Sequence, residues 1–300
     1  MKGFVNINKP IAVSSAFVVQ KVKRAIWNAY GEKMKVGHFG TLDPMARGVL
    51  PIAVGTATRL FDYAQAKTKI YQATFKFGVE TDTLDSEGSI VKTDEKPVKK
   101  EDIISALKGF VGAIDQVPPM YSAKSIDGKR AYQLARNGES VELEPKRIEI
   151  FDFKLIEDAN GKVLLQDGER KLEENEYAFE IACSSGTYIR ALARDLAAAL
   201  GTVGYMSSLL RVQSGAFSLK NSVSLDDFLN NPQQYILPLE IVTDAFCTYN
   251  LDEKYAEKVL NGVKLNFDNL PTGDFVVKIK GEIVGIATNQ NEILKFKTRL

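Results

Sequence analysis

Residues 37–51 read GHFGTLDPMARGVLP, and our prediction of the fold starts from this segment of the 300-residue sequence. Three glycines and two prolines within 15 residues indicate a tightly shaped loop rather than a linker. Asp43 precedes Pro44, which favours an extended backbone at the aspartate, so its carboxylate can point away from the local chain. For an isolated Asp-Pro pair, an aspartate that stabilises its own turn is the competing interpretation.

The segments around this loop show both helical and strand patterns. Apolar residues at helical spacing predict helices over residues 14–30, 99–111, 130–137, 187–200 and 253–260. Alternating apolar and polar residues predict strands over residues 70–77, 148–155 and 177–183, and a hairpin that joins 275–279 to 283–288. In the first of these strands, the pattern places Tyr71 on the buried face and Gln72 on the opposite face. The charged residues 157–176 are predicted to form a surface hairpin or loop.

The composition excludes several classes of protein. With 45% hydrophobic and 26% charged residues, the chain has the proportions of a soluble globular protein. One histidine and two cysteines leave too few ligands for a typical zinc site, and the sequence has neither a phosphate-binding loop nor a dinucleotide fingerprint. If the protein is an enzyme, we therefore expect it to use carboxylate, Tyr, Lys and Arg groups without a metal or cofactor.

The sequence also indicates a cellular location. Its longest uncharged stretch, residues 196–210, is shorter than the roughly 18–20 apolar residues of a membrane helix. The first 13 residues lack the apolar region of a signal peptide, and two cysteines suit a reducing compartment. We therefore expect a cytoplasmic protein with no membrane contact.

The distribution of charge suggests a polyanionic partner. Residues 1–60 hold nine basic and two acidic side chains, and residues 121–136 hold four basic and one acidic. Residues 157–180 are the reverse, with eight acidic and three basic side chains. Such asymmetry is expected for a nucleic-acid-binding face. Uneven scatter of ordinary surface charge is the alternative.

Five motifs in order carry a family resemblance. The loop at 37–51 resembles the catalytic loop of the TruB family, the bacterial tRNA pseudouridine-55 synthases. The other motifs that resemble those of the family lie at residues 8–15, 69–88, 118–136 and 185–211. One position departs from the pattern: the thumb lysine of the family is shifted to Lys124, so we do not transfer its RNA contact.

The resemblance implies an α/β (α+β) pseudouridine-synthase fold with a largely antiparallel central sheet. Residues 1–248 would form the catalytic domain, with an inserted thumb at about 118–145. Residues 249–300 would form a small β-rich, PUA-like RNA-binding domain.

The resemblance also implies the roles of individual residues. Asp43 corresponds to the catalytic carboxylate and Arg190 to the arginine that pairs with it. Tyr71 corresponds to the tyrosine that stacks on the flipped base and is a candidate for handling the C5 proton. By pattern alone, Tyr71 would be a core residue and Arg190 a surface residue of a helix.

The implied substrate contacts lie in three of the motifs. Tyr188 and Leu209 match residues that line the uracil pocket, although packing alone would explain a leucine. His38 matches the histidine that contacts the flipped nucleotide, with loop hydrogen bonding as the alternative. Lys9 is assigned to substrate binding as a phosphate-facing group, with a structural role as the alternative.

The implied function is isomerisation of the uridine at position 55, in the T-arm loop of tRNA, to pseudouridine after base flipping. The expected partner is the T-arm stem-loop of tRNA, with no DNA, no cofactor and no obligate protein partner, and we expect a monomer. Two alternatives remain: an RNA-binding or RNA-folding protein with a vestigial pocket, and a guide-RNA-directed relative that needs partner proteins. The short C-terminal domain favours the stand-alone type.

Overall fold

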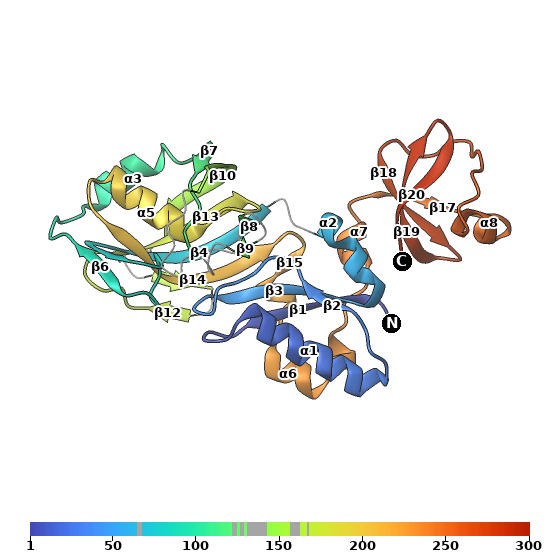
Figure 1. Cartoon of the computed structure of the whole chain (residues 1–300), viewed down its shortest axis with the longest axis horizontal. Helices are drawn as coiled ribbons and strands as arrows, with labels where there is room; N and C mark the ends of the chain where they lie inside the picture. Colours follow the sequence, from blue (N-terminus) through green and yellow to red (C-terminus); the bar gives the residue numbers. More distant parts are fainter. Residues whose placement is uncertain (65–67, 122–124, 127–128, 131–142, 157–162, 167) are drawn as a thin grey trace.

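The loop at residues 37–51 leads into the middle of one large, strongly twisted sheet (Figure 1). The computed structural model describes the chain except for residues 65–67, 122–124, 127–128, 131–142, 157–162 and 167. Within the described chain the strand order is β16-β1-β3-β14-β4-β13-β10-β7, with β2 beside β3 and β15 beside β14. These strands are β1 (Gly3–Lys9), β2 (Val36–His38), β3 (Arg47–Val54), β4 (Thr68–Phe77), β7 (Gly112–Gln116), β10 (Lys146–Leu155), β13 (Glu176–Ser184), β14 (Gly204–Ser214), β15 (Phe217–Ser218) and β16 (Val223–Ser224).

Most neighbouring strands run antiparallel, which confirms the predicted fold class. The two parallel pairs of this sheet are β1 with β16 and β3 with β14. In the second pair, Leu210 lies beside Arg47 and Arg211 beside Gly48. The loop therefore ends where an N-terminal group of strands joins the rest of the sheet.

The predicted helix at 14–30 is observed as α1 (Ser15–Tyr30). The Ser14 side chain accepts a hydrogen bond from the backbone N–H of Phe17, and Gly31, at φ 71°, ends the helix in the left-handed conformation. Figure 1 shows α1 beside α6 (Leu225–Asn230) at one end of the sheet.

Two other predicted helices are shorter than expected. Helix α5 (Ile189–Ala199) begins two residues after Thr187 because Tyr188 has an extended backbone. Helix α3 (Lys100–Leu107) ends before residue 111 because the chain tightens into turns before it enters β7. The remaining α-helices of the described chain are α2 (Phe61–Ala64), α7 (Glu240–Thr243) and α8 (Ala256–Leu260). The last follows a 3₁₀ turn at Glu253–Tyr255, so the two together span the helix expected at 253–260.

The central strand β4 is covered on both sides. Tyr71, Phe75 and Phe77 belong to the main hydrophobic core, which also includes side chains of α1 and α5. Gln72 and Thr74, whose positions alternate with these, are buried as well. Thr74 shares hydrogen bonds with the hydroxyls of β14, so the second face of the strand is polar but covered.

The C-terminal residues form a second, smaller sheet with its own core, as predicted. Its strands are β17 (Cys247–Asn250), β18 (Asp274–Ile279), β19 (Glu282–Gln290) and β20 (Ile293–Arg299). The predicted hairpin turns at Lys280 and Gly281, both with positive φ, as a two-residue type I′ turn requires. The division expected between 248 and 249 falls inside β17, whose four residues all pair with β18.

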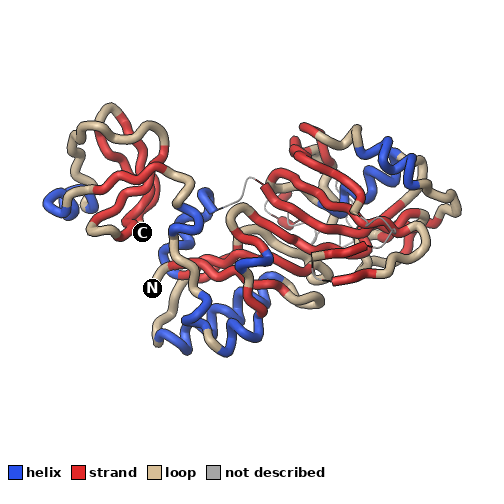
Figure 2. The backbone as a smooth tube through the Cα atoms, turned by 180° about the vertical axis from the view of Figure 1, so that it is seen from behind, coloured by secondary structure: helices blue, strands red, loops and turns tan. Residues whose placement is uncertain are grey.

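The small sheet is set apart from the large one but is joined to it at its base (Figure 2). Val276, Ile283 and Ile286 belong to a hydrophobic cluster that includes Phe4 and Leu60 of the N-terminal part of the chain. The Lys2 ammonium also donates a hydrogen bond to the carbonyl of Ile283, and the Arg59 guanidinium donates one to the carbonyl of Arg299. Within the described chain, no helix has the length and apolar character needed to span a membrane.

Several expectations fall partly outside the described residues. Most of the thumb at 118–145 and of the helix expected at 130–137 lies there; Arg130 itself belongs to a strand. The charged stretch 157–176 was predicted to form a surface hairpin or a loop, and its described part contains a hairpin. The short strands in these regions are β8 (Ser125–Ile126), β9 (Lys129–Arg130), β11 (Val163–Leu165) and β12 (Gly168–Arg170); β5 (Val79–Thr81) and β6 (Ile90–Thr93) pair with each other earlier in the chain.

Candidate active site

Asp43 and Arg190, which lie 147 positions apart in the sequence, form an ion pair. The Nε atom of Arg190 is 3.1 Å from Oδ2 of Asp43. The arginine side chain is only 7% exposed, whereas the aspartate side chain is 35% exposed. A buried cation therefore holds a carboxylate that still reaches the surface.

A second carboxylate shares the same guanidinium. Nη1 of Arg190 is 3.2 Å from Oδ2 of Asp85, whose side chain is 5% exposed. Nη1 also donates to the carbonyl of Thr83, at 2.9 Å, and Nη2 donates to the carbonyl of Tyr121, at 2.8 Å. These four partners fix the plane of the guanidinium and the direction in which it presents Nε to Asp43.

The electrostatic balance at Asp43 sets its acidity. Burial raises the pKa of the Asp43 carboxyl above its ordinary value, and the positive charge of Arg190 opposes this shift. The nearby charge of Asp85 raises the pKa further, while Lys9 lowers it. The pKa of Glu87 is also raised, first by its burial and then by Asp85 and Asp43. Asp43 thus belongs to a compact group of interacting charges.

Backbone contacts hold the loop that carries Asp43. The Ser15 hydroxyl donates to the carbonyl of Leu42 at 2.8 Å and accepts from the Leu42 N–H at 2.9 Å. On the other side of the aspartate, the N–H of Ala12 donates to the carbonyl of Pro44. The first turn of α1 and the chain before it therefore fix the residues on both sides of Asp43.

Lys9 lies beneath this loop and is fully buried. Its ammonium donates to the carbonyls of Pro10, Val13 and Pro44 at 2.9, 2.7 and 3.3 Å. Burial lowers the pKa of Lys9 to about 8, although Asp43 opposes that shift. The side chain faces backbone carbonyls of its own surroundings and has no exposed surface.

Arg211 anchors the two ends of the loop. It is fully buried, and it donates from Nε to the carbonyl of Val49 and from Nη2 to the carbonyl of Gly40. Gly40 and Gly48 both have positive φ, and a Cβ at Gly48 would lie 2.3 Å from the Arg211 carbonyl oxygen. Only glycine fits at position 48, because backbone that cannot move occupies the space.

Tyr71 on β4 and Leu209 on β14 lie on the same face of the sheet. Tyr71 pairs with Arg211 across β4 and β14, and Leu209 pairs with Ala73 two positions along. Both side chains are buried in the main core. Burial raises the pKa of the Tyr71 phenol, with Arg211 opposing the shift, so the hydroxyl stays protonated at neutral pH.

Tyr188 precedes α5 and His38 ends β2. The Tyr188 N–H donates to the side-chain oxygen of Gln116 at 2.8 Å, and the side-chain NH2 of Gln116 donates to the Tyr188 carbonyl at 3.1 Å. The Tyr188 side chain is half-buried. His38 ends β2, where burial and then Arg211 lower the pKa of its imidazole. Its buried Nδ1 has no hydrogen-bond partner among the described residues.

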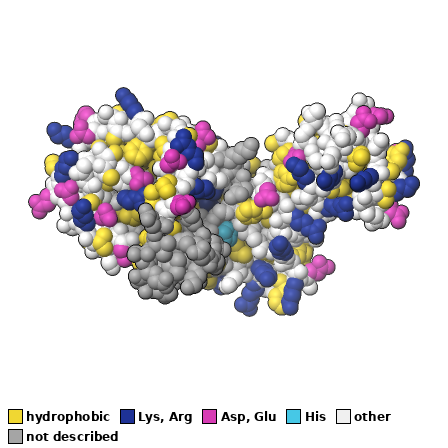
Figure 3. Space-filling model, turned by 45° about the horizontal axis from the view of Figure 1, so that its top comes forward, with side chains coloured by type: hydrophobic (Ala, Val, Ile, Leu, Met, Phe, Trp, Pro, Cys, Tyr) yellow, Lys and Arg dark blue, Asp and Glu magenta, His cyan; other side chains and the backbone are white. Residues whose placement is uncertain are grey.

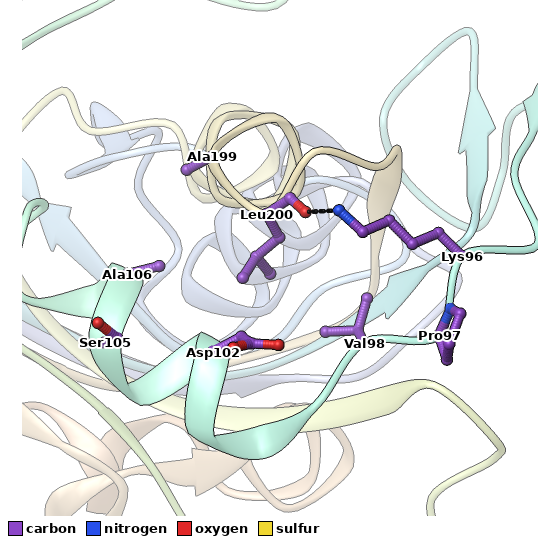
Figure 4. A pocket seen from close by; sticks show the side chains of 8 residues that line it. All are labelled: Lys96, Pro97, Val98, Asp102, Ser105, Ala106, Ala199 and Leu200. Atoms are coloured by element: carbon purple, nitrogen blue, oxygen red, sulfur yellow. Dashed lines mark hydrogen bonds between the residues drawn. The ribbon is translucent and has the colours of Figure 1, made fainter.

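A cavity of about 460 Å³ lies elsewhere, between α3 and the end of α5 (Figure 4). Lys96 crosses it and donates a hydrogen bond to the Leu200 carbonyl at the end of that helix. None of the predicted site residues lines it. In the part of the chain that the structure describes, no three His, Cys, Asp or Glu side chains are grouped to hold a metal ion.

The site contains groups that the sequence analysis did not assign. Asp85 and Ser15 lie inside recognised motifs, but no pattern showed that they would contact Arg190 and the loop. Arg211 had a recognisable signal: it interrupts an apolar run between Leu210 and Val212, where a charge must either be exposed or find buried partners.

Comparison with known families matches most of the chain. A family model described as "TruB family pseudouridylate synthase (N terminal domain)" matches residues 27–189. A second, described as "tRNA pseudouridylate synthase B C-terminal domain", matches residues 190–243.

Similar proteins named tRNA pseudouridine synthase B match over nearly the same length. The Clostridium kluyveri protein is 37% identical over 299 residues, covering 97% of this chain and 96% of its own. The Clostridium tetani protein is 36% identical over 302 residues, covering 98% of each chain. The Anaplasma marginale protein is 42% identical over 269 residues, covering 87% of this chain and 81% of its own.

Solved structures show the same fold. A chain in the "Crystal Structure of a Cbf5-Nop10-Gar1 Complex" superposes with a TM-score of 0.69 and 21% identity, covering 99% of this chain and 84% of that one. A chain in the "Structure of H/ACA RNP bound to a substrate RNA containing 2'-deoxyuridine" gives a TM-score of 0.69, 20% identity and the same coverage.

Proposed function

The chain belongs to the TruB family of pseudouridylate synthases, and we propose from this that it converts a uridine of tRNA into pseudouridine. The substrate we infer is the uridine at position 55, in the T-arm loop. The observation that carries the proposal is the Asp43–Arg190 pair at 3.1 Å, with a buried guanidinium and a carboxylate that remains accessible.

The proposed reaction is a redox-neutral isomerisation. The C1′–N1 glycosidic bond breaks, the uracil turns, and a bond forms between C1′ and C5. The C5 proton is lost and N1 gains a proton, so atoms and electrons balance. A carboxylate suits such glycosyl chemistry either as a nucleophile or as a base. We assign this role to Asp43, with its point of attack left open between the base, the sugar carbon and a sugar proton.

The neighbouring residues support that carboxylate. Arg190 favours the charged form of Asp43 against the effect of burial. We propose that the Tyr71 ring stacks on the uracil after the base has been flipped out of the RNA, since stacked flipped bases are usual for enzymes that act on a base. The raised pKa of Tyr71 keeps its phenol protonated, so taking up the C5 proton would first require loss of the phenol proton.

The other site residues contribute contacts or support. Leu209 would form an apolar wall for the base and Tyr188 a half-buried one, and the His38 side chain would contact the flipped nucleotide. We propose that Lys9 positions the Asp43 loop and does not touch the substrate, because its three hydrogen bonds go to backbone carbonyls. In this proposal the enzyme is a cytoplasmic monomer that acts without a cofactor or partner protein, with residues 118–145 and the C-terminal sheet adding RNA contacts.

The experiment that tests the function is incubation of the purified chain alone with an unmodified tRNA transcript, followed by mapping of pseudouridine. We expect stoichiometric conversion at position 55. Conversion only after partner proteins and a guide RNA are added would favour the guide-directed alternative. Tight tRNA binding with no conversion would favour an RNA-binding protein with an inactive pocket.

We expect Asp85→Asn to move the pH dependence of catalysis. Asp85 raises the pKa of Asp43, so removing its charge should lower that pKa. Since the reaction needs ionised Asp43, the acid limb of the kcat/KM profile should shift to lower pH. The control is Asp82→Asn, an exposed neighbour that binds the Ser89 N–H. An acid limb that stays in place or moves to higher pH would contradict this account.

We expect Lys9→Met to separate positioning from substrate contact. The substitution removes three hydrogen bonds to buried carbonyls and should lower the free energy of unfolding by about 1–3 kcal/mol. Because the side chain has no exposed surface, tRNA affinity should stay within about threefold of wild type while kcat falls. Urea titration and filter binding measure the two effects. If Lys9→Met has wild-type stability but binds tRNA tenfold more weakly, Lys9 contacts a phosphate of the substrate instead.

A further inference from the structure

The outward face of α1 combines exposed aromatic rings with positive charge. Its inner face is buried through Val18, Val22 and Ile26. On the outer face Phe17 is 41% exposed and Trp27 is 48% exposed, although burying such rings would normally be favourable. Two exposed aromatic side chains on one short helix face suggest that something contacts them.

The charges on this face are all of one sign. Lys21, Lys23 and Arg24 are exposed, and α1 contains no acidic residue. The ammonium of Lys21 lies 5.2 Å from the centre of the Phe17 ring, and that of Lys33 lies 5.2 Å from the centre of the Trp27 ring. Figure 3 shows Lys and Arg side chains gathered with hydrophobic ones at the lower edge of the molecule, where Figure 1 places α1.

The position of the helix links this face to the reaction site. The first residue of α1, Ser15, holds the backbone of Leu42 next to Asp43. The helix has 16 residues, so its outer face extends about 24 Å away from the Asp43 loop. A substrate that reaches Asp43 and is larger than its target loop can therefore continue along α1.

We propose that the outer face of α1, formed by Phe17, Lys21, Arg24 and Trp27, is a second binding surface for the substrate tRNA. Lys21 and Arg24 hold phosphates, and the two rings stack on unpaired bases. This pairing of cations with aromatic rings is the chemistry by which proteins bind unpaired nucleotides. The proposal rests on the proposed function and extends it from the target loop to a second part of the same tRNA.

Trp27 provides a direct measurement, because it is the only tryptophan in the chain. Titration of the full-length protein with unmodified tRNA should change the Trp27 emission, with a midpoint at the Kd measured by filter binding. Phe17→Ala should weaken tRNA binding by about fivefold or more, the lower end of what one stacked base contributes.

Charge reversal tests the phosphate contacts. Lys21→Glu/Arg24→Glu should weaken tRNA binding by at least about tenfold and reduce the slope of log affinity against log salt by about two. Because phosphate contacts position the RNA without selecting the base, the modified uridine should stay the same. The control is Lys99→Glu/Lys108→Glu, which changes the net charge equally at exposed positions beside α3, at the other end of the large sheet from α1.

Unchanged Trp27 emission at saturating tRNA overturns the proposal, as does a Lys21→Glu/Arg24→Glu variant that binds tRNA no more weakly than the control. Trp27 emission that changes with protein concentration alone, together with a dimer in sedimentation, would assign the face to a second copy and also overturn it. Failure of the proposed function looks different: the wild-type protein would form no pseudouridine in any tRNA, whatever the emission of Trp27.

Discussion

Asp43→Asn is expected to abolish pseudouridine formation, with a loss of at least about a thousandfold in the single-turnover rate. The amide keeps the shape of the side chain but is neither a nucleophile nor a base at neutral pH. Folding should survive, because the side chain is partly exposed and Arg190 keeps Asp85 as a partner. Affinity for tRNA should stay within a few-fold of wild type, since phosphate contacts elsewhere supply most of the binding.

The control for this variant is Asp115→Asn, which removes an exposed carboxylate paired with Arg147 on β10. It should retain the wild-type rate. Rates are measured by release of tritium from C5-labelled uridine in tRNA, and the mass of each purified variant is verified. Substantial turnover by Asp43→Asn would remove Asp43 from its catalytic role, whereas loss of tRNA binding in the same variant would make the aspartate a binding residue instead.

Arg190→Ala is expected to cost both activity and stability. The substitution leaves Asp85 buried without its cation and also removes the donors to the carbonyls of Thr83 and Tyr121. Removing one partner of a buried ion pair typically costs about 3–5 kcal/mol, which we expect to see in the free energy of unfolding. Product formation should be undetectable, because Asp43 loses the charge that opposes the rise in its pKa.

Arg190→Lys keeps the test valid if the alanine variant does not fold. A lysine supplies one charge but cannot reproduce the planar set of donors, so the protein should fold while its activity remains low. The matched control is Arg194→Ala, one turn further along α5, where the side chain is more exposed and pairs with Asp195. That change should cost less stability than Arg190→Ala, because the Arg194–Asp195 pair is more exposed than the pairs of Arg190. Wild-type rates in both Arg190 variants would show that the ion pair plays no part in catalysis.

Helix ends, turns and tight loops could be predicted from the sequence because they depend on residues that are neighbours along the chain. The helix predicted over 14–30 is observed with Ser14 as its N-cap, and the turn at Lys280–Gly281 joins the expected hairpin. The three glycines and two prolines of residues 37–51 indicated a shaped loop. Gly48 is required there because a side chain at this position would meet the backbone of β14. The ordered motifs indicated the family, which the comparisons then showed.

Other properties of the site required the tertiary structure. The sharing of one guanidinium by Asp43 and Asp85 depends on the packing of α5 against two separate loops. The complete burial of Arg211 and the second covered face of β4 likewise depend on which strands become neighbours. No period or spacing in the sequence reports these contacts, because each joins segments far apart along the chain.

The sequence by itself determined the family and the type of fold and indicated candidate residues for the chemistry, because motifs and local propensities act over a few neighbouring positions. The tertiary structure decided which of those residues are buried, which share a partner and which direction a charged side chain faces. Lys9 shows the difference: its motif is visible in the sequence, but only the packed loop turns its ammonium toward three carbonyls. The physical reason is desolvation, which depends on everything packed around a charge and therefore exists only once the chain has folded.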